Sequence, residues 1–136
     1  NIKGKDVASI AMKMISGIHC NVELSYASKI EHDRFPETYI LIEGEKGSIE
    51  LAPDFWLRTT TESGTHSVKI NIPRYGWADE QYGVVHASIV DANKDFLKMI
   101  CKQEQAETTG EDNLKTLELV FTAEQSARDN RTIEIN

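Results

Sequence analysis

The chain has 136 residues and a formal net charge of −7 at pH 7, from 15 basic and 22 acidic residues. This length is close to the commonest size of one domain and allows a core without a disulfide or a metal. Hydrophobic residues make up 40% and charged residues 27%, which excludes a disordered or collagen-like chain. The basic residues are scattered, so we expect no nucleic-acid partner. No apolar run reaches the roughly 18 residues of a membrane span.

The two cysteines, Cys20 and Cys101, lie far apart and outside any Cys-x-x-Cys spacing. Such cysteines are typical of small buried hydrophobes in a reducing compartment, rather than of a disulfide or a metal clip. We therefore expect a cytoplasmic protein. No two histidines stand four positions apart, so no zinc site is expected.

The first half of the chain predicts three β-hairpins, because runs rich in apolar residues flank short connections that contain glycine. The expected strands cover residues 9–15, 19–28, 38–43, 48–51, 55–61 and 66–72. The connections are residues 16–18, 44–47 and 62–65.

The second half switches to helical spacing. Over residues 84–102 apolar side chains recur every three or four positions, which predicts a long helix. A second helix is expected to begin after Thr109, its N-cap, and to end at Asn130 in the left-handed conformation. A short closing strand is expected over residues 131–135.

Strands followed by helices predict an α+β fold, with an open, mostly antiparallel β-sheet and two long helices packed on one face. One strand is apolar on both sides, since Ile40 and Ile42 alternate with Tyr39 and Leu41. The helices can cover one side only. We therefore expect a partner chain or another domain to cover part of the other.

Two long connections, residues 30–37 and 74–83, are not explained by turn chemistry. The first carries His32 and Arg34, which could bind a polar or anionic group; a solvated surface loop is the alternative. The second carries Trp77 and Tyr82, and these could line a cleft together with His86, one helical turn after Tyr82. Amphipathic aromatic residues are common in sugar and polyol sites. The alternative is that the three rings pack the helix onto the sheet.

No Gly-rich phosphate loop, G-x-S-x-G elbow or H-E-x-x-H helix occurs. We therefore assign no catalytic residue, no cofactor-binding residue and no metal ligand. A self-contained enzyme would need His32 or His86 paired with a carboxylate, and nothing in the spacing requires such a pair.

Several short motifs follow one another in a characteristic order. They are Asp6-Val7-Ala8, the Gly-x-x-Gly hairpin of residues 40–51, Asp95-Phe96, Gly110-Glu111-Asp112, Ser126-Ala127 and the closing residues 131–135. In this order they resemble the Gfo/Idh/MocA-type oxidoreductases, the glucose-fructose oxidoreductase and inositol dehydrogenase family. Asn130 stands where many relatives have Gly, and Asn tolerates the same left-handed conformation.

The resemblance implies the C-terminal domain of an oxidoreductase that acts on a hydroxyl group of a sugar or polyol. In that family an N-terminal Rossmann domain binds NAD or NADP, while the C-terminal domain shapes the substrate site and assembles oligomers through its sheet. The family's catalytic lysine, in Glu-Lys-Pro, and its Asp-x-x-x-His helix match no position here. By position, residues 30–37 resemble the stretch that approaches the substrate, which favours His32 and Arg34.

We therefore expect residues 1–136 to be a single substrate and oligomerisation domain, without catalytic activity or a cofactor of its own. Its expected partners are its missing Rossmann domain, a second copy of the chain at the sheet face and a small sugar or polyol. The first residue, Asn1 rather than Met, indicates an excised domain. The alternative is a stand-alone, non-catalytic binding or assembly module that dimerises through the same face.

Overall fold

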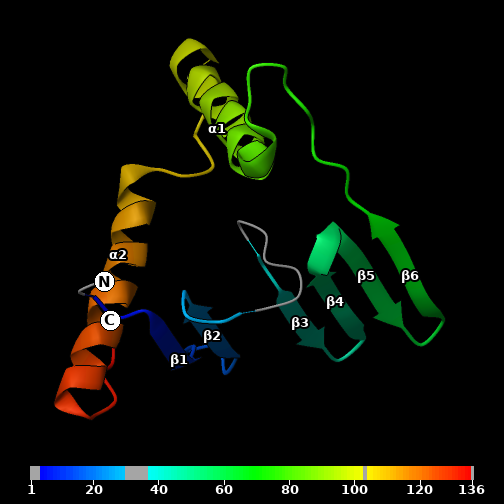
Figure 1. Ribbon diagram of the computed structural model, residues 1–136. Coiled ribbons are helices and arrows are strands. Elements are labelled where there is room, and N and C mark those ends of the chain that lie inside the picture. Colours follow the sequence, from blue (N-terminus) through cyan, green and yellow to red (C-terminus); the bar gives the residue numbers. More distant parts are fainter. Residues whose placement is uncertain (1–3, 30–36, 103, 136) are drawn as a thin grey trace. The chain divides into compact units, whose positions relative to one another are not determined.

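The computed structural model describes residues 4–29, 37–102 and 104–135 of the chain. They belong to two compact units: unit 1 comprises Asn1–Lys29 and Gln105–Asn136, and unit 2 is Ile30–Glu104. Each unit holds one open antiparallel sheet and one long helix (Figure 1). This confirms the predicted α+β class, with the strands distributed over a two-stranded and a four-stranded sheet.

The sheet of unit 1 is a hairpin of β1 (Val7–Lys13) and β2 (His19–Ser25). The second strand ends three residues before the predicted end. The reason is that the Ser25 hydroxyl accepts hydrogen bonds from the backbone N–H groups of Ala27 and Ser28, at 3.2 and 3.1 Å. Such local bonds compete with a strand ladder and turn the chain away from it.

The helix of unit 1, α2 (Gly110–Asp129), has both predicted caps. The Thr109 hydroxyl accepts a hydrogen bond from the Asp112 N–H at 3.2 Å, which satisfies one of the donors left over in the first turn. Asn130 is left-handed, with φ 51° and ψ 44°, and its N–H donates to the Ser126 carbonyl. Local side-chain chemistry therefore sets both ends of this helix.

The predicted closing strand over residues 131–135 is wrong, since these residues pair with no strand in the described part of the chain. The Arg131 N–H donates to the Ser126 carbonyl at 3.2 Å, and the Ser126 hydroxyl donates to the Arg131 carbonyl at 2.7 Å. The end of α2 thus uses the backbone groups that Arg131 would need for a ladder.

The sheet of unit 2 has its four strands in sequence order. Tight turns join β3 to β4 and β5 to β6, as the hairpin patterns predicted. The strands are β3 (Ile40–Gly44), β4 (Gly47–Ala52), β5 (Trp56–Thr61) and β6 (Gly64–Lys69). A short 3₁₀ segment, η1 (Pro53–Phe55), links β4 to β5. The last strand begins earlier than predicted, because Gly64 pairs with Thr61 across a two-residue turn, and it ends at Lys69 instead of Ile72.

The strand register sorts the side chains of unit 2 onto two chemically different faces, because directly paired residues point to the same side. One side, called here the apolar sheet face, carries Ile40, Ile42, Ile49, Leu51, Leu57 and Val68 beside Thr59, Thr61 and His66. Within β3–β6 this face has no Asp, Glu, Lys or Arg. The other side, the polar sheet face, carries Glu43, Glu50, Arg58 and Lys69 beside Leu41 and Trp56.

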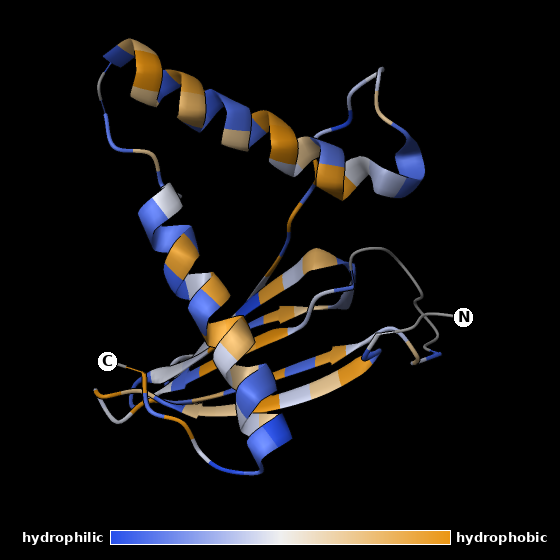
Figure 2. Cartoon of the chain, turned by 90° about the vertical axis from the view of Figure 1, so that its left-hand side faces the viewer, coloured by the Kyte–Doolittle hydropathy of each residue, from blue (hydrophilic) through white to orange (hydrophobic). Residues whose placement is uncertain are grey.

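Large apolar side chains remain exposed in both units, and among the described residues the buried hydrophobic ones are Ala52, Ala87 and Ala106. On the apolar sheet face Ile42 is 60% exposed. Apolar segments alternate with polar ones along the helices and strands (Figure 2). The fold therefore presents more apolar surface than scattered surface residues account for.

The helix of unit 2, α1 (Gly83–Lys102), matches the predicted range. It follows directly from a 3₁₀ turn, η2 (Glu80–Tyr82), because Gly83 itself has helical φ and ψ. Both cysteines are free. Cys101 near the end of α1 is exposed, so its predicted burial is wrong, and Cys20 on β2 is only half-buried. Neither this helix nor α2 is long and apolar enough to cross a membrane.

Candidate functional site

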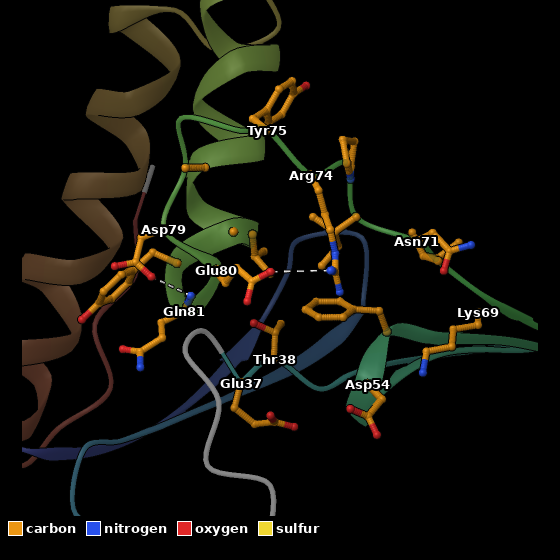
Figure 3. Close-up of a pocket in the computed structure, with 18 of the residues that line it drawn as sticks. Glu37, Thr38, Asp54, Lys69, Asn71, Arg74, Tyr75, Asp79, Glu80 and Gln81 are labelled. Atoms are coloured by element: carbon orange, nitrogen blue, oxygen red, sulfur yellow. Dashed lines mark hydrogen bonds and ion pairs between the residues drawn. The ribbon is translucent and has the colours of Figure 1, made fainter.

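The long connection between β6 and α1 lines a hollow of about 1230 Å³ in unit 2 (Figure 3). The η1 segment and the residues that precede β3 complete its wall. The lining residues are 37–38, 52–55, 69–76 and 78–84. The hollow therefore includes most of one of the two connections that turn chemistry left unexplained.

Local hydrogen bonds fix the shape of this connection. The Ala78 N–H donates to the Tyr75 carbonyl at 3.0 Å, and the Tyr82 N–H donates to the Asp79 carbonyl at 3.1 Å. The Asp79 carboxylate accepts from the Gln81 N–H at 2.9 Å and so caps η2. Two successive turns thus carry the chain from the sheet into α1.

Charged side chains of both signs line the hollow. Arg74 and Glu80 point toward one another (Figure 3), with 3.6 Å between the Arg74 Nη1 and Glu80 Oε1 atoms. Their side chains are 91% and 89% exposed. An ion pair this exposed contributes about 0–1 kcal/mol to stability, so little free energy holds the two side chains together.

Two consecutive residues of the wall have backbone angles that non-glycine residues rarely adopt. Asp54 has φ 61° and Phe55 has φ 62°. For a bulky side chain such as Phe this region is a true outlier. The Phe55 carbonyl accepts the Ile70 N–H at 2.9 Å, next to the Trp56–Lys69 pair, and this bond extends the β5–β6 ladder up to the segment. Conformations of this kind concentrate at ligand-binding and active sites.

The predicted aromatic group is divided between two places. The rings of Trp77 and His86 meet edge to face, with centroids 5.4 Å apart. Tyr82 lines the hollow, whereas Trp77 and His86 are absent from its wall. Tyr75, which the sequence did not single out, links the two: it lines the hollow and stacks on Trp77 with centroids 5.4 Å apart.

The other predicted site residues, His32 and Arg34, lie outside the described residues. His86 forms no ion pair with any carboxylate in the described part of the chain. In the same part of the chain, no three His, Cys, Asp or Glu side chains are placed to hold a metal ion.

A second polar cluster lies on the polar sheet face. The Arg58 guanidinium donates to the Glu50 carboxylate at 2.9 Å, and the Tyr39 hydroxyl donates to its other oxygen at 3.1 Å. Both bonds hold the pKa of Glu50 below its usual value, and the bond from Arg58 has the larger effect. The bond to Glu50 in turn raises the pKa of Tyr39. Each member has its partner within the sheet, so we interpret this cluster as structural.

Sequence reasoning missed the charged residues of the hollow. Arg74 and Glu80 are six positions apart on an irregular segment, where no periodicity indicates which side chains meet. Asp54 and Phe55 follow Pro53 without a glycine, so nothing in the sequence indicates left-handed backbone there.

No family model matches this chain. The chain is 34% identical over 134 residues to a D-apiose dehydrogenase of Paraburkholderia graminis, and 33% identical to one of Rhizobium rhizogenes. Each alignment covers 98% of this chain. The chain spans only 36% and 39% of the length of these two relatives.

The chain is also similar to part of a larger protein of known structure. A crystal structure of an oxidoreductase from Agrobacterium radiobacter, in complex with NAD+, L-tartaric acid and magnesium, superposes with a TM-score of 0.93 and 32% identity. The match covers 98% of this chain and 39% of that one. The chain is therefore homologous, over nearly its whole length, to part of a larger oxidoreductase.

Proposed function

We propose that this chain is the substrate-side and oligomerisation domain of an NAD(P)-dependent oxidoreductase of the Gfo/Idh/MocA type. The whole protein would act on a hydroxyl group of a sugar or polyol. The observation that supports this is the similarity to two D-apiose dehydrogenases over 98% of the chain. It makes D-apiose the first substrate to test.

The described residues do not fit a dinucleotide. A pyrophosphate binds where a Gly-rich loop leads into a helix with free N–H groups and no negative side chains. Here no Gly-rich loop precedes either long helix. Glu80 lies in the turn that leads into α1, whose own first turn has no acidic residue, and Glu111 and Asp112 lie in the first turn of α2. We therefore assign NAD or NADP to a separate Rossmann domain of the whole protein, and we route no step of a reaction through this chain's residues.

The substrate contacts that we propose come from unit 2. Tyr82 lines the hollow, and Trp77 and His86 form the aromatic pair reached through Tyr75. His32 and Arg34 belong to this proposal by their position in the sequence alone. Aromatic side chains with a polar tip suit a ligand that has both hydroxyl groups and C–H faces.

The oligomer that we propose forms through the sheet. The apolar sheet face has no Asp, Glu, Lys or Arg within β3–β6, and the centres of homodimer interfaces are likewise depleted of charged residues. Two copies that each carry a charge of −7 meet with least repulsion where neither presents a charge.

Two measurements test the proposed function. Calorimetric titration of the 136-residue chain with NAD+ and with NADP+ is expected to show no binding. The full-length protein, incubated with D-apiose and either dinucleotide, is expected to produce the reduced nicotinamide, with a reaction lacking sugar as the control. Tight dinucleotide binding by the 136-residue chain would contradict the proposal, as would the absence of turnover with D-apiose and other sugars and polyols.

The exposed apolar sheet face supports a second candidate function, a non-catalytic binding or assembly module. The same assay separates the two. A protein that assembles into oligomers but turns over no sugar or polyol would support this second candidate.

A further inference from the structure

We propose that the hollow of unit 2 binds an uncharged polyhydroxylated compound, and that Arg74 and Glu80 recognise its adjacent hydroxyl groups. The hollow is further inferred to discriminate against the corresponding carboxylic acids. This inference rests on the proposed function in so far as the ligand is taken to be the substrate. The binding preference itself is measured separately from turnover.

The hydrogen-bond donors and acceptors of Arg74 and Glu80 match those of two adjacent hydroxyl groups. The Arg74 guanidinium only donates hydrogen bonds, and the Glu80 carboxylate only accepts them. A hydroxyl group does both, so two adjacent hydroxyl groups can accept from Arg74 and donate to Glu80. The 3.6 Å between Nη1 and Oε1 is longer than a hydrogen bond. These two groups therefore retain hydrogen-bonding capacity that a diol can use.

The Arg74 and Glu80 side chains can separate at little cost in free energy. The two side chains are about nine-tenths exposed, so separating them to admit a hydroxyl group costs about 0–1 kcal/mol. The backbone beneath them is held more firmly, by the turns at Tyr75 and Asp79 and by the bond from Ile70 to Phe55. The charged ends of Arg74 and Glu80 can therefore move, while hydrogen bonds hold the backbone of the hollow in place.

The described wall of the hollow carries more negative than positive side chains. Among the described residues of the wall, four carboxylates, Glu37, Asp54, Asp79 and Glu80, outnumber two cations, Lys69 and Arg74. The excess of negative charge repels an anion and leaves a neutral sugar or polyol unaffected. The tyrosine rings of the wall, Tyr75 and Tyr82, offer apolar faces to the C–H groups of such a ligand.

The test compares two probes with the same carbon skeleton. Threitol is neutral, and L-tartrate carries a carboxylate at each end and the same pair of central hydroxyl groups. Binding of each to the full-length protein is measured by NMR titration without dinucleotide. We expect threitol to bind more tightly than L-tartrate. A wild-type preference for L-tartrate would overturn the inference.

Two substitutions make the test specific. Glu80→Gln removes the charged acceptor and leaves Arg74 without its opposite charge. It is expected to weaken threitol binding about tenfold and to strengthen L-tartrate binding. Arg74→Gln is expected to weaken both. Asp91→Asn breaks an exposed ion pair with Lys94 outside the hollow and is expected to change neither.

A merely structural role predicts that Glu80→Gln moves both affinities in the same direction, and this result would overturn the inference. Both positions are exposed, so thermal unfolding is expected to be unchanged and serves as the folding control. Activity is read out independently. Absence of D-apiose oxidation, with the threitol and L-tartrate pattern intact, overturns the proposed function alone. Oxidation with an unaltered ligand preference in both variants overturns the inference alone.

Discussion

Gly47, the first residue of β4, occupies a conformation that no other residue can share. Its φ is +151°, and a Cβ atom at this position would lie 2.1 Å from the Thr60 carbonyl oxygen on the neighbouring strand. That oxygen belongs to the backbone and cannot swing aside. Gly64, at the corresponding place in the next hairpin, has φ +121° but open space around it. Substitutions at the two glycines therefore distinguish the effect of a backbone clash from the effect of conformational strain.

We predict that Gly47→Ala lowers the free energy of unfolding by about 2–4 kcal/mol, because it combines an unfavourable φ with a clash. Gly64→Ala is expected to cost about 1–2 kcal/mol, since only the strain remains. Urea unfolding of the two variants and the wild type measures the difference. Equal losses in the two variants would contradict this account.

Positions governed by their own side chain or by close neighbours could be predicted at the residue scale. Thr109 and Asn130 cap α2 through bonds to atoms within a few residues, so the local sequence contains the whole cause. Asp54 and Phe55 are the opposite case. Both have positive φ, and the Phe55 carbonyl bonds to Ile70, directly after the paired strand β6. No local pattern indicates this backbone conformation.

Hairpins could be predicted at the element scale, but the ends of their strands could not. The alternation of apolar and polar residues located all three hairpins. The ends depend on single bonds, such as those that the Ser25 hydroxyl accepts beyond β2. Ser126 likewise bonds to the N–H and carbonyl of Arg131, the first residue of the predicted closing strand, and so withdraws both groups from a ladder. Side-chain bonds to the backbone therefore overrule periodicity where the two compete.

The cluster of Tyr39, Glu50 and Arg58 ties β4 to β5, and both to the residue that precedes β3, on the polar sheet face. Arg58, and then Tyr39, lower the pKa of Glu50 from its usual value of 4.5. A carboxyl group with a lowered pKa in the folded state binds a proton less readily than it does in the unfolded chain. Its stabilising contribution is therefore present above about pH 4.5 and is lost as the pH falls through the lower, folded-state pKa.

We predict that Glu50→Gln lowers the melting temperature near neutral pH, and that this difference shrinks as the solution is acidified below pH 4.5. Thermal unfolding followed by circular dichroism, from neutral pH down to about pH 3, measures it. Glu62→Gln, in the turn between β5 and β6, removes the same charge outside the cluster. A difference between wild type and Glu50→Gln that does not vary with pH would contradict the prediction.

At the scale of the whole molecule, the candidate site shows where the sequence stops being informative. The connection after β6 was identified correctly as irregular, and Tyr82 lies in the hollow. Trp77 and His86 contact each other outside its wall, and Tyr75 joins them to it. Which rings meet depends on the path of the connection, which is set by turns and by a bond between distant segments. Residue type alone could not decide this.

The apolar sheet face carries the last prediction. Ile49 and Ser48 are adjacent on β4 and point to opposite faces. Ile49→Lys places a charge at the centre of the proposed interface, whereas Ser48→Lys places the same charge on the polar sheet face, opposite Glu43. In a twofold-symmetric interface each substitution occurs twice, and burying an unpaired charge is strongly unfavourable. Ile49→Lys is therefore expected to raise the dissociation constant of the oligomer at least about 100-fold.

Sedimentation velocity of the full-length protein measures this effect over a range of concentrations. Ser48→Lys is expected to sediment as the wild type does. If another domain of the same chain covers the face instead, Ile49→Lys lowers the unfolding temperature and leaves the oligomeric state unchanged, which contradicts the proposed interface. A monomeric wild-type protein would contradict it as well. A loss of assembly confined to Ile49→Lys distinguishes the two sheet faces, because the two variants differ only in the side from which the lysine projects.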